Sequence, residues 1–361
     1  MRIGVVGGGY WGSKHVRVLS SLAAVTQVVL VEPRADRRES LTALNPRLLA
    51  FGDLTSAMPH VDALVIATPP STHGDLAQRA LEAGKHVLVE KPLTTDVNQA
   101  RRIVEQAHRS DLVLMAGHTF EYNAAVWRLR DTIRDGDLGD VYFVDTARLN
   151  LGLYQPDVNV VWDLAPHDIS IINHILGARP DVVQAWGNSH AHAYLEDVAH
   201  LRLEYKAIEV AAEVRVSWLD PRKVRRVTVV GSRKMAVYND LAEDERIRIY
   251  DKAVHTSGPP PNGHGTGSGN GISYHYGGVT SPSFPFEEPL LVEDRHFVGC
   301  IQAGATPATD GWNGLAVVEV LVAAETSLRE RCPVHLERDA LPPIGQGRSG
   351  PVPSADSQVV A

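Results

Sequence analysis

The sequence predicts an α/β fold in two parts: a doubly wound parallel sheet, then an α+β domain with a large, open, mainly antiparallel sheet. Residues 1 to 120 alternate short runs that are apolar throughout with amphipathic helical patterns. This alternation is typical of a parallel sheet covered by helices on both faces. From residue 121 on, several long runs alternate polar and apolar side chains with period two. Such runs indicate antiparallel strands with one covered face.

Five short runs rich in β-branched residues are the expected strands of the first part. In chain order they are IGVVG, QVVLVE, VDALVIATP, HVLVEK and LVLMAG. Amphipathic stretches such as GDLAQRALEAG and DVNQARRIVEQAHR lie between them. Because parallel strands need a crossover connection, this order predicts strands joined by helices.

The second part is expected to begin with a helix over about residues 122–136. The strand VYFVDTARLNL follows, and then a helix that the stretch WDLAPHDIS begins. The further expected strands are VAHLRLEY, AIEVAAEVRVSW, RRVTVVG and KMAVYND. Residues 255–283 are rich in Gly, Pro and Ser and predict a long loop or lid, in which Tyr274 and Tyr276 are candidate lid residues. Two helices, near 289–304 and 312–331, are expected to close the fold.

The composition excludes several classes of protein. The chain has 361 residues, of which 44% are apolar and 22% charged, as in a soluble globular protein. A net charge of -8 without a Lys/Arg block argues against a nucleic-acid partner. Two cysteines are too few for a disulfide framework. The start MRIGVVGGG lacks a signal-peptide pattern, and no apolar run approaches the length of a membrane span. We therefore expect a cytoplasmic protein.

The stretch GVVGGGYWGSKH predicts a dinucleotide site, because it directly follows the first expected strand and opens the first helix. Gly7 permits a tight turn, Gly9 lets a pyrophosphate approach the backbone, and Gly12 lets the helix pack close to the strand. The helix N-terminus offers free N–H groups and a partial positive charge to the phosphates. A glycine-rich turn can also be purely structural. Glu32, at the end of the second strand, favours the Rossmann interpretation, because a carboxylate there holds the ribose hydroxyls.

NAD is the expected cofactor, since a carboxylate at Glu32 would repel the 2′-phosphate of NADP. Arg34 lies close enough in the sequence to leave NADP possible. Three aromatic residues are candidates to stack near the cofactor, although such residues more often fill the core: Tyr10, Trp11 and Trp162.

Polar residues also follow other strands, at the edge where a parallel sheet presents its ligands. ATPPSTH covers residues 67 to 73, and VEKPL covers residues 89 to 93 with Lys91 at its centre. In WDLAPHDIS, Asp163 and His167 are four residues apart, so on a helix they share one face. Histidine suits proton transfer near neutral pH. Asp163 taken alone would be a helix N-cap, and a metal site with Asp168 is the other alternative.

Together these motifs resemble the glucose-fructose oxidoreductase / inositol dehydrogenase / MocA-type family, from residue 1 to about 335. The resemblance implies an NAD(P)-dependent enzyme that oxidises or reduces hydroxyl groups of sugars, cyclitols and related compounds. It also implies an open C-terminal sheet that often forms the oligomer interface. The segment GHTFEYN departs from the arginine-rich version of many members. We therefore expect the chain to comprise a Rossmann domain over 1–120, a substrate-binding and oligomerisation domain over 121–337, and a disordered tail over 338–361.

The resemblance assigns roles to matching positions. It implies that Lys91 contacts the substrate and that Asp163 and His167 are the other two polar residues of the family's site. The segments beside the nicotinamide and its ribose contain Thr68, Pro69, His73 and Glu90. We expect His167 to take the hydroxyl proton, Lys91 to stabilise the developing alkoxide, and Asp163 to orient the pair. Further candidates for binding a polyhydroxy substrate precede the WDLAPHDIS helix: Arg148, Asn150 and Tyr154.

The expected function is therefore hydride transfer between NAD and a secondary hydroxyl of a sugar derivative. The expected substrate is a nucleotide-linked or amino sugar that reacts at C3. An inositol or cyclitol dehydrogenase, or a 3-ketosugar reductase, is the alternative within enzymes. A non-catalytic NAD-binding sensor or partner subunit is the alternative of another class. A homo-oligomer, dimer or tetramer, is expected through the C-terminal sheet.

Overall fold

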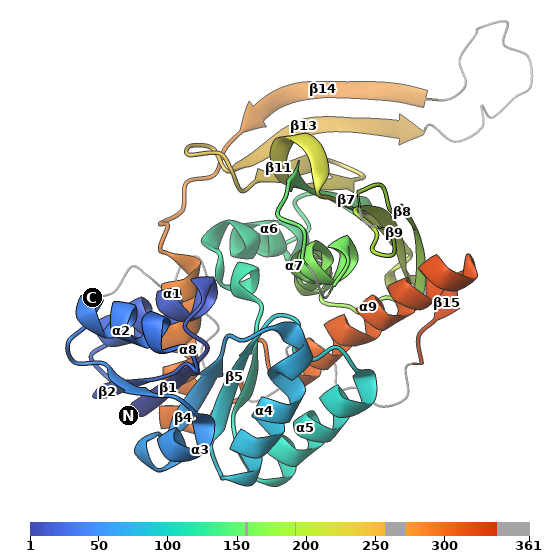
Figure 1. Ribbon diagram of the computed structural model, residues 1–361. Helices are drawn as coiled ribbons and strands as arrows, with labels where there is room; N and C mark the ends of the chain where they lie inside the picture. Colours follow the sequence, from blue (N-terminus) through green and yellow to red (C-terminus); the bar gives the residue numbers. More distant parts are fainter. Residues whose placement is uncertain (156–157, 192, 257–271, 338–361) are drawn as a thin grey trace, which may run out of the picture.

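The computed structural model describes residues 1–155, 158–191, 193–256 and 272–337, and two sheets organise them (Figure 1). The first has six strands, all parallel, in the order β3-β2-β1-β4-β5-β6. Its strands are β1 (Arg2–Val6), β2 (Gln27–Val31), β3 (Leu49–Phe51), β4 (Ala63–Ile66), β5 (His86–Glu90) and β6 (Leu114–Gly117). This is the doubly wound sheet that the apolar runs predict.

Helices cover both faces of this sheet, which explains why its strands are apolar throughout. They are α1 (Tyr10–Ser21), α2 (Ala35–Leu44), α3 (Leu54–Ala57), α4 (His73–Glu82) and α5 (Val97–Arg109). In β1, Ile3 and Val5 pack with Leu19 of α1, whereas Val6 belongs to the core on the opposite face. The β1–α1 turn therefore lies at the carboxyl edge of the sheet, where parallel sheets bind ligands.

The second sheet has nine strands in the order β14-β13-β12-β11-β7-β10-β9-β8-β15. Its strands are β7 (Val141–Leu151), β8 (Val182–Asn188), β9 (Val198–Tyr205), β10 (Val210–Ser217), β11 (Leu219–Gly231), β12 (Met235–Asn239), β13 (Ile247–Thr256), β14 (Ile272–Thr280) and β15 (Val334–His335). All neighbouring pairs are antiparallel except β7 with β10. The predicted mainly antiparallel sheet is confirmed.

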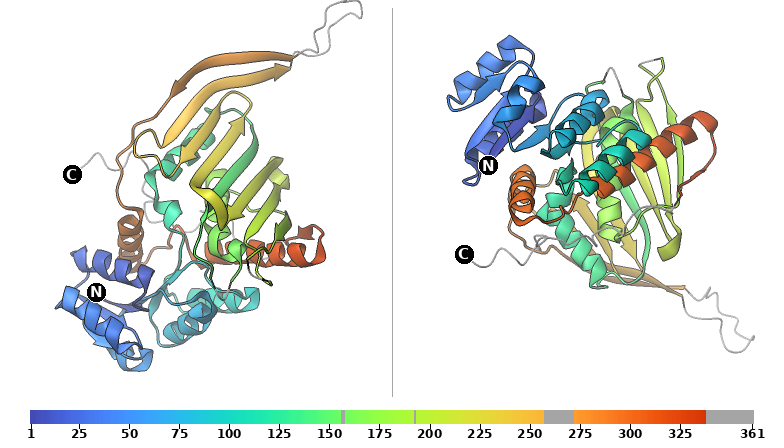
Figure 2. Two further views of the ribbon diagram at one scale, coloured as in Figure 1. Left: turned by 45° about the horizontal axis from the view of Figure 1, so that its top comes forward. Right: turned by 90° about the horizontal axis from the view of Figure 1, so that it is seen from below.

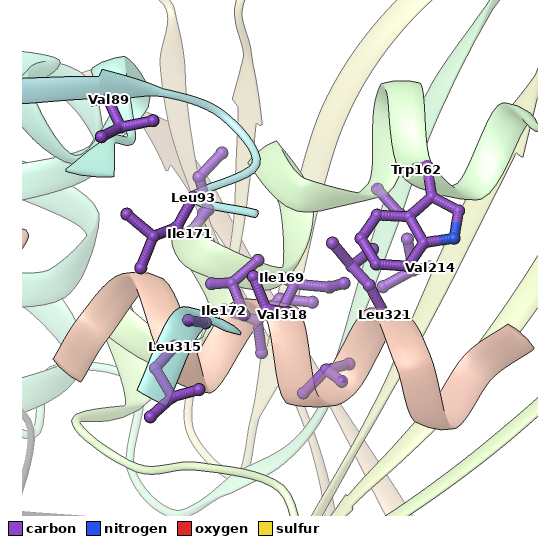
Figure 3. Close-up of a cluster of buried hydrophobic side chains, with 14 of the residues drawn as sticks. Val89, Leu93, Trp162, Ile169, Ile171, Ile172, Val214, Leu315, Val318 and Leu321 are labelled. Atoms are coloured by element: carbon purple, nitrogen blue, oxygen red, sulfur yellow. The ribbon is translucent and has the colours of Figure 1, made fainter. Parts of the chain in front are cut away.

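Helices α6 (Ala124–Arg134), α7 (Val160–Leu176) and α9 (Gly311–Glu330) accompany this sheet. Two of them, α7 and α9, pack on one of its faces, and Figure 2 shows the other face uncovered. Ile169 and Ile172 of α7 meet Val318 and Leu321 of α9 in a buried cluster with Val214 of β10 (Figure 3). This packing fixes α7 between the second sheet and the carboxyl edge of the first.

Helix α8 (Pro289–Ala303) returns to the first part of the chain and packs on α1. Its Phe297 and Val298 share a buried core with Ile3 and Val5 of β1. A domain boundary at residue 120 would therefore leave α8 apart from the core in which it packs. We propose that the N-terminal unit includes α8.

Several elements differ from the sequence-based expectation. The expected loop over 255–283 is wrong in part, because β13 and β14 pair as a hairpin that extends beyond the rest of the sheet (Figure 1). Residues 257–271 and the expected tail over 338–361 lie outside the described residues. Tyr274 and Tyr276 are exposed on strand β14, on the hairpin rather than in a loop. The strand at 182–188 carries Gln184 and Trp186 on its solvent side and was not expected.

None of the described helices has the length and apolarity of a membrane span.

Candidate active site

Two adjoining cavities lie where the carboxyl edge of the first sheet meets α7. The smaller, of about 620 Å³, is lined by Thr68, Lys91 and Asp163, among others. The larger, of about 810 Å³, contains His167. Trp11 and Glu90 line both cavities, so the two lie side by side. Small-molecule sites are typically clefts in which a few polar groups converge.

The glycine-rich turn has the geometry that a dinucleotide requires. Gly7 has φ of 98°, a left-handed conformation that favours glycine, and a Cβ there would lie 2.5 Å from the carbonyl oxygen of Ala67. A Cβ at Gly12 would overlap the carbonyl oxygen of Gly7, whereas Gly9 faces open space. Among the described residues, no side chain caps the N-terminus of α1 at Gly9. The free N–H groups and the open space above Gly9 therefore fit a pyrophosphate.

Glu32 lies at the end of β2 and points back to this turn. Its buried carboxylate accepts hydrogen bonds from the backbone N–H of Gly8 at 2.7 Å and of Arg34 at 3.0 Å. The guanidinium of Arg34 instead pairs with Asp36, at 2.6 Å. A carboxylate fixed beside the turn suits ribose hydroxyls and disfavours a 2′-phosphate.

Lys91 and Asp163 meet across the smaller cavity. The Nζ of Lys91 donates to the backbone carbonyl of Asp163 at 2.7 Å and lies 3.4 Å from its Oδ1. The indole N–H of Trp218 donates to the Oδ2 of Asp163 at 3.0 Å. Asp163 is thus the counter-ion of Lys91, and both carboxylate oxygens have a fixed partner.

His167 lies one turn along α7 and lines the larger cavity. Its ring packs edge-on against Phe120, with centroids 5.0 Å apart, and its Nδ1 has no hydrogen-bond partner among the described residues. Burial, and then the positive charges of Lys91, Arg148 and Arg225, hold the pKa of His167 well below 6.5. The ring is therefore neutral at pH 7 and able to accept a proton.

The three expected substrate contacts differ in their surroundings. Arg148 is buried on β7 and forms a bidentate pair with Asp168, at 2.7 and 3.3 Å, with its guanidinium over the Phe120 ring. Asn150 is two residues further along β7, on the same face and partly exposed. The hydroxyl of Tyr154 donates to Asp197 at 3.2 Å. Arg148 therefore already has a partner in the structure.

The other candidate cofactor residues fall into two groups. Tyr10 is exposed at the start of α1, and Thr68 and Pro69 lie beside the smaller cavity, Thr68 in its lining. His73 and Trp162 are buried. The ring nitrogens of His73 lie 2.7 Å from the carbonyl of Pro92 and 2.8 Å from that of Thr68, so this histidine ties together the two loops that flank the cavity. The indole N–H of Trp162 donates to Glu325, and the side of its ring lines the smaller cavity.

Helix α7 begins earlier than the sequence indicates. Asn159 is its N-cap, with the side-chain oxygen accepting from the N–H groups of Val161 and Trp162. Asp163 is therefore not the cap, and Pro166 lies inside the helix. The helix ends at Gly177, whose φ of 60° is the left-handed conformation that favours glycine.

Some residues of the site had no signal in the sequence. Trp218 reaches Asp163 from the end of β10, and Phe120 and Arg225 line the larger cavity. His118, at the end of β6, is fully buried, and neither ring nitrogen has a partner among the described residues. Only the position of His118 after an apolar strand could have drawn attention to it. No group of three or more His, Cys, Asp or Glu among the described residues is placed to hold a metal ion.

Two family models match separate parts of the chain. Residues 1–118 match the model of an oxidoreductase family with an NAD-binding Rossmann fold, and residues 126–237 match the GFO/IDH/MocA C-terminal domain. The chain is 31% identical over 346 residues to UDP-N-acetylglucosamine 3-dehydrogenase of Acidithiobacillus ferrooxidans, covering 91% of this chain and 99% of that protein. It is 24% identical over 341 residues to inositol 2-dehydrogenase of Rhizobium meliloti, covering 92% and 98%. The WlbA dehydrogenase of Bordetella pertussis, solved with NADH and UDP-GlcNAcA, has a similar fold, with a TM-score of 0.75, 19% identity and coverage of 94% and 99%.

Proposed function

We propose that this chain, which belongs to the GFO/IDH/MocA oxidoreductase family, oxidises a secondary hydroxyl of a nucleotide-linked or amino sugar, at C3, with NAD. The observation that carries the proposal is the placement of Lys91, Asp163 and His167 around two adjoining cavities beside the glycine-rich turn. A cation, its counter-ion and a neutral imidazole are the groups that alcohol oxidation requires.

Each residue of the site has a defined task in this proposal. NAD, when bound, supplies the acceptor for the hydride. His167 takes the hydroxyl proton, because its lowered pKa leaves the imidazole neutral at pH 7. The Lys91 ammonium stabilises the negative charge that develops on the same oxygen. Asp163 holds Lys91 in place as its counter-ion, and Trp218 holds Asp163.

The larger cavity supports a substrate that carries phosphates and a base. Its lining includes two cations, Lys14 and Arg225, the second of them paired with Asp240 at 3.2 Å. It also includes the carboxylates of Glu90 and Glu288 and the aromatic side chains of Trp11, Phe120 and Phe286. Cations suit phosphate oxygens and aromatic faces suit a nucleobase. The relatives that are named for UDP-linked sugars support the same choice. The match to an inositol dehydrogenase keeps a cyclitol as the second candidate.

The test is absorbance at the reduced-nicotinamide band, with NAD and a panel of UDP- and dTDP-sugars, free amino sugars and inositols. We expect reduction with a UDP-amino sugar, loss of turnover in Lys91→Ala, and NAD binding by calorimetry unchanged in that variant. Repetition with NADP tests Glu32, and we expect weaker activity. Turnover with inositols alone would show that the substrate is a cyclitol and not a nucleotide-linked or amino sugar. Silence with every compound, while NAD still binds, would support a non-catalytic NAD-binding sensor or partner subunit.

We also propose a cytoplasmic homo-oligomer that is formed through the uncovered face of the nine-stranded sheet. Trp186 of β8, Phe143 and Leu151 of β7 are exposed on this face. Large apolar side chains on one open face are typical of a protein interface.

A further inference from the structure

A buried histidine connects the cofactor helix to the catalytic loop. His15 lies on α1 and is 0% exposed. Its Nδ1 lies 2.8 Å from the Oδ1 of Asp294 on α8, and its Nε2 lies 3.1 Å from the Oε1 of Glu90 at the end of β5. The ring therefore joins α1, to which it belongs, to two elements that are far apart in the sequence.

Glu90 carries this contact on to Lys91. Its second oxygen, Oε2, accepts a hydrogen bond from the backbone N–H of Lys91 at 3.1 Å. Glu90 also lines both cavities. A continuous chain of polar contacts thus runs from Asp294 through His15 and Glu90 to Lys91, whose Nζ binds Asp163.

The carboxylates around His15 influence the charge of its ring. Burial opposes a charge on the ring, but Asp294 and Glu90 raise the pKa of His15 well above 6.5, so both nitrogens donate. A third carboxyl, Glu293, faces the same group from α8, and its Oε2 accepts from the Thr119 hydroxyl at 2.8 Å. Burial and the neighbouring Glu90 raise the pKa of Glu293 well above its ordinary value, which favours the neutral form of this carboxyl.

Buried ionic groups contribute little net stability compared with apolar packing, because desolvation offsets their attraction. Apolar side chains would fill the space between α1, β5 and α8 at no such cost. A buried ionic chain that ends on the backbone of Lys91 is therefore better explained by what it holds in place.

We propose that His15 is a positioning residue, which sets Glu90 and through it the backbone of Lys91 at the junction of the two cavities. Where it concerns turnover, this inference rests on the proposed function. The geometric part, that His15 controls the position of Lys91, does not depend on the substrate.

Two substitutions separate positioning from a general structural role. In His15→Asn the amide nitrogen lies near the place of Nδ1, so the contact with Asp294 is kept and that with Glu90 is lost. In His15→Gln the amide nitrogen reaches the place of Nε2, so the contact with Glu90 is kept. Each variant removes one buried contact. A role in stability alone would therefore affect both similarly.

The first readout is acetylation of lysines by limiting acetic anhydride, measured by mass spectrometry as the ratio of Lys91 to Lys85. Lys85 lies beside the opposite end of β5 and is the internal reference. We expect the ratio to rise several-fold in His15→Asn and to stay near the unsubstituted value in His15→Gln. Equal ratios in all three proteins would overturn the inference. If His15→Asn does not fold, Glu90→Ala takes its place, since it leaves His15 paired with Asp294 and should free Lys91 equally.

The second readout is turnover, since a displacement of about 1 Å can cost on the order of 100-fold in rate. We expect kcat to fall about 10- to 100-fold in His15→Asn and less than about threefold in His15→Gln, with KM for NAD nearly constant in both. Equal losses of kcat in the two variants would overturn the positioning role. If the unsubstituted protein shows no turnover but the acetylation ratios differ as expected, the proposed function fails and the positioning of Lys91 stands.

Discussion

Replacement of Asp168 by Ala is expected to destabilise the folded protein, because it breaks a buried ion pair beside the site. The side chains of Arg148 and Asp168 are only 6% and 2% exposed, and two hydrogen bonds of 2.7 and 3.3 Å join them. The third guanidinium nitrogen of Arg148, Nη1, has no partner among the described residues. In Asp168→Ala the arginine therefore becomes a buried cation without a counter-ion.

The expected loss in the free energy of unfolding follows from this burial. Removal of one partner of a buried pair costs about 3–5 kcal/mol, because the remaining charge is left desolvated. With an m-value of about 3 kcal/mol/M, the urea midpoint should fall by roughly 1–2 M. Tryptophan fluorescence is a suitable probe, since Trp162 and Trp218 are buried in the same core as α7.

The control removes both charges. Arg148→Met combined with Asp168→Leu leaves no unpaired charge, and such replacements of buried pairs are often neutral or stabilising. We therefore expect the double variant to unfold near the midpoint of the unsubstituted protein. A shift below about 0.3 M in Asp168→Ala, or an equal loss in the double variant, would refute the reasoning.

Three further predictions concern the site and the sheet. Trp218→Phe keeps the ring but removes the hydrogen bond to Asp163, which is worth about 1.5–3 kcal/mol to a charged group, so kcat should fall at least about 10-fold, as measured by NADH formation. Because burial and nearby cations lower the pKa of His167, the neutral base is lost only on acidification, and the acid limb of kcat/KM should lie below pH 6.5. A limb near pH 7 or above would contradict His167 as the base. Trp186→Asp on the uncovered face should lower the mass that light scattering gives for the oligomer, and an unchanged mass would exclude this face as the interface.

Features encoded within short stretches were predictable from the sequence. The turn with Gly7, Gly9 and Gly12, the carboxylate of Glu32 and the strand end at Lys91 each combine a local hydrophobic pattern with a residue type that has few other uses there. The β13–β14 hairpin was not predicted, because the residues between its strands are rich in Gly, Pro and Ser and obscure the period-two pattern of the strand that follows.

Contacts between distant segments were beyond the reach of sequence patterns. Asp294 is 279 residues from His15, and Trp218 is 55 residues from Asp163. Neither pair has a spacing that marks it, since the partners meet only because α8 returns to α1 and because β10 ends beside α7.

The case of Asp163 shows why spacing identifies a face but not a partner. A separation of four residues places Asp163 and His167 on the same side of α7, which remains true whichever group each side chain binds. The carboxylate binds Lys91 and Trp218, while the imidazole turns to Phe120 and the larger cavity. This division has a chemical consequence. Because Asp163 pairs with Lys91 rather than with His167, burial and then the cations around the imidazole set its pKa, and they keep the base neutral at the pH at which it must accept a proton.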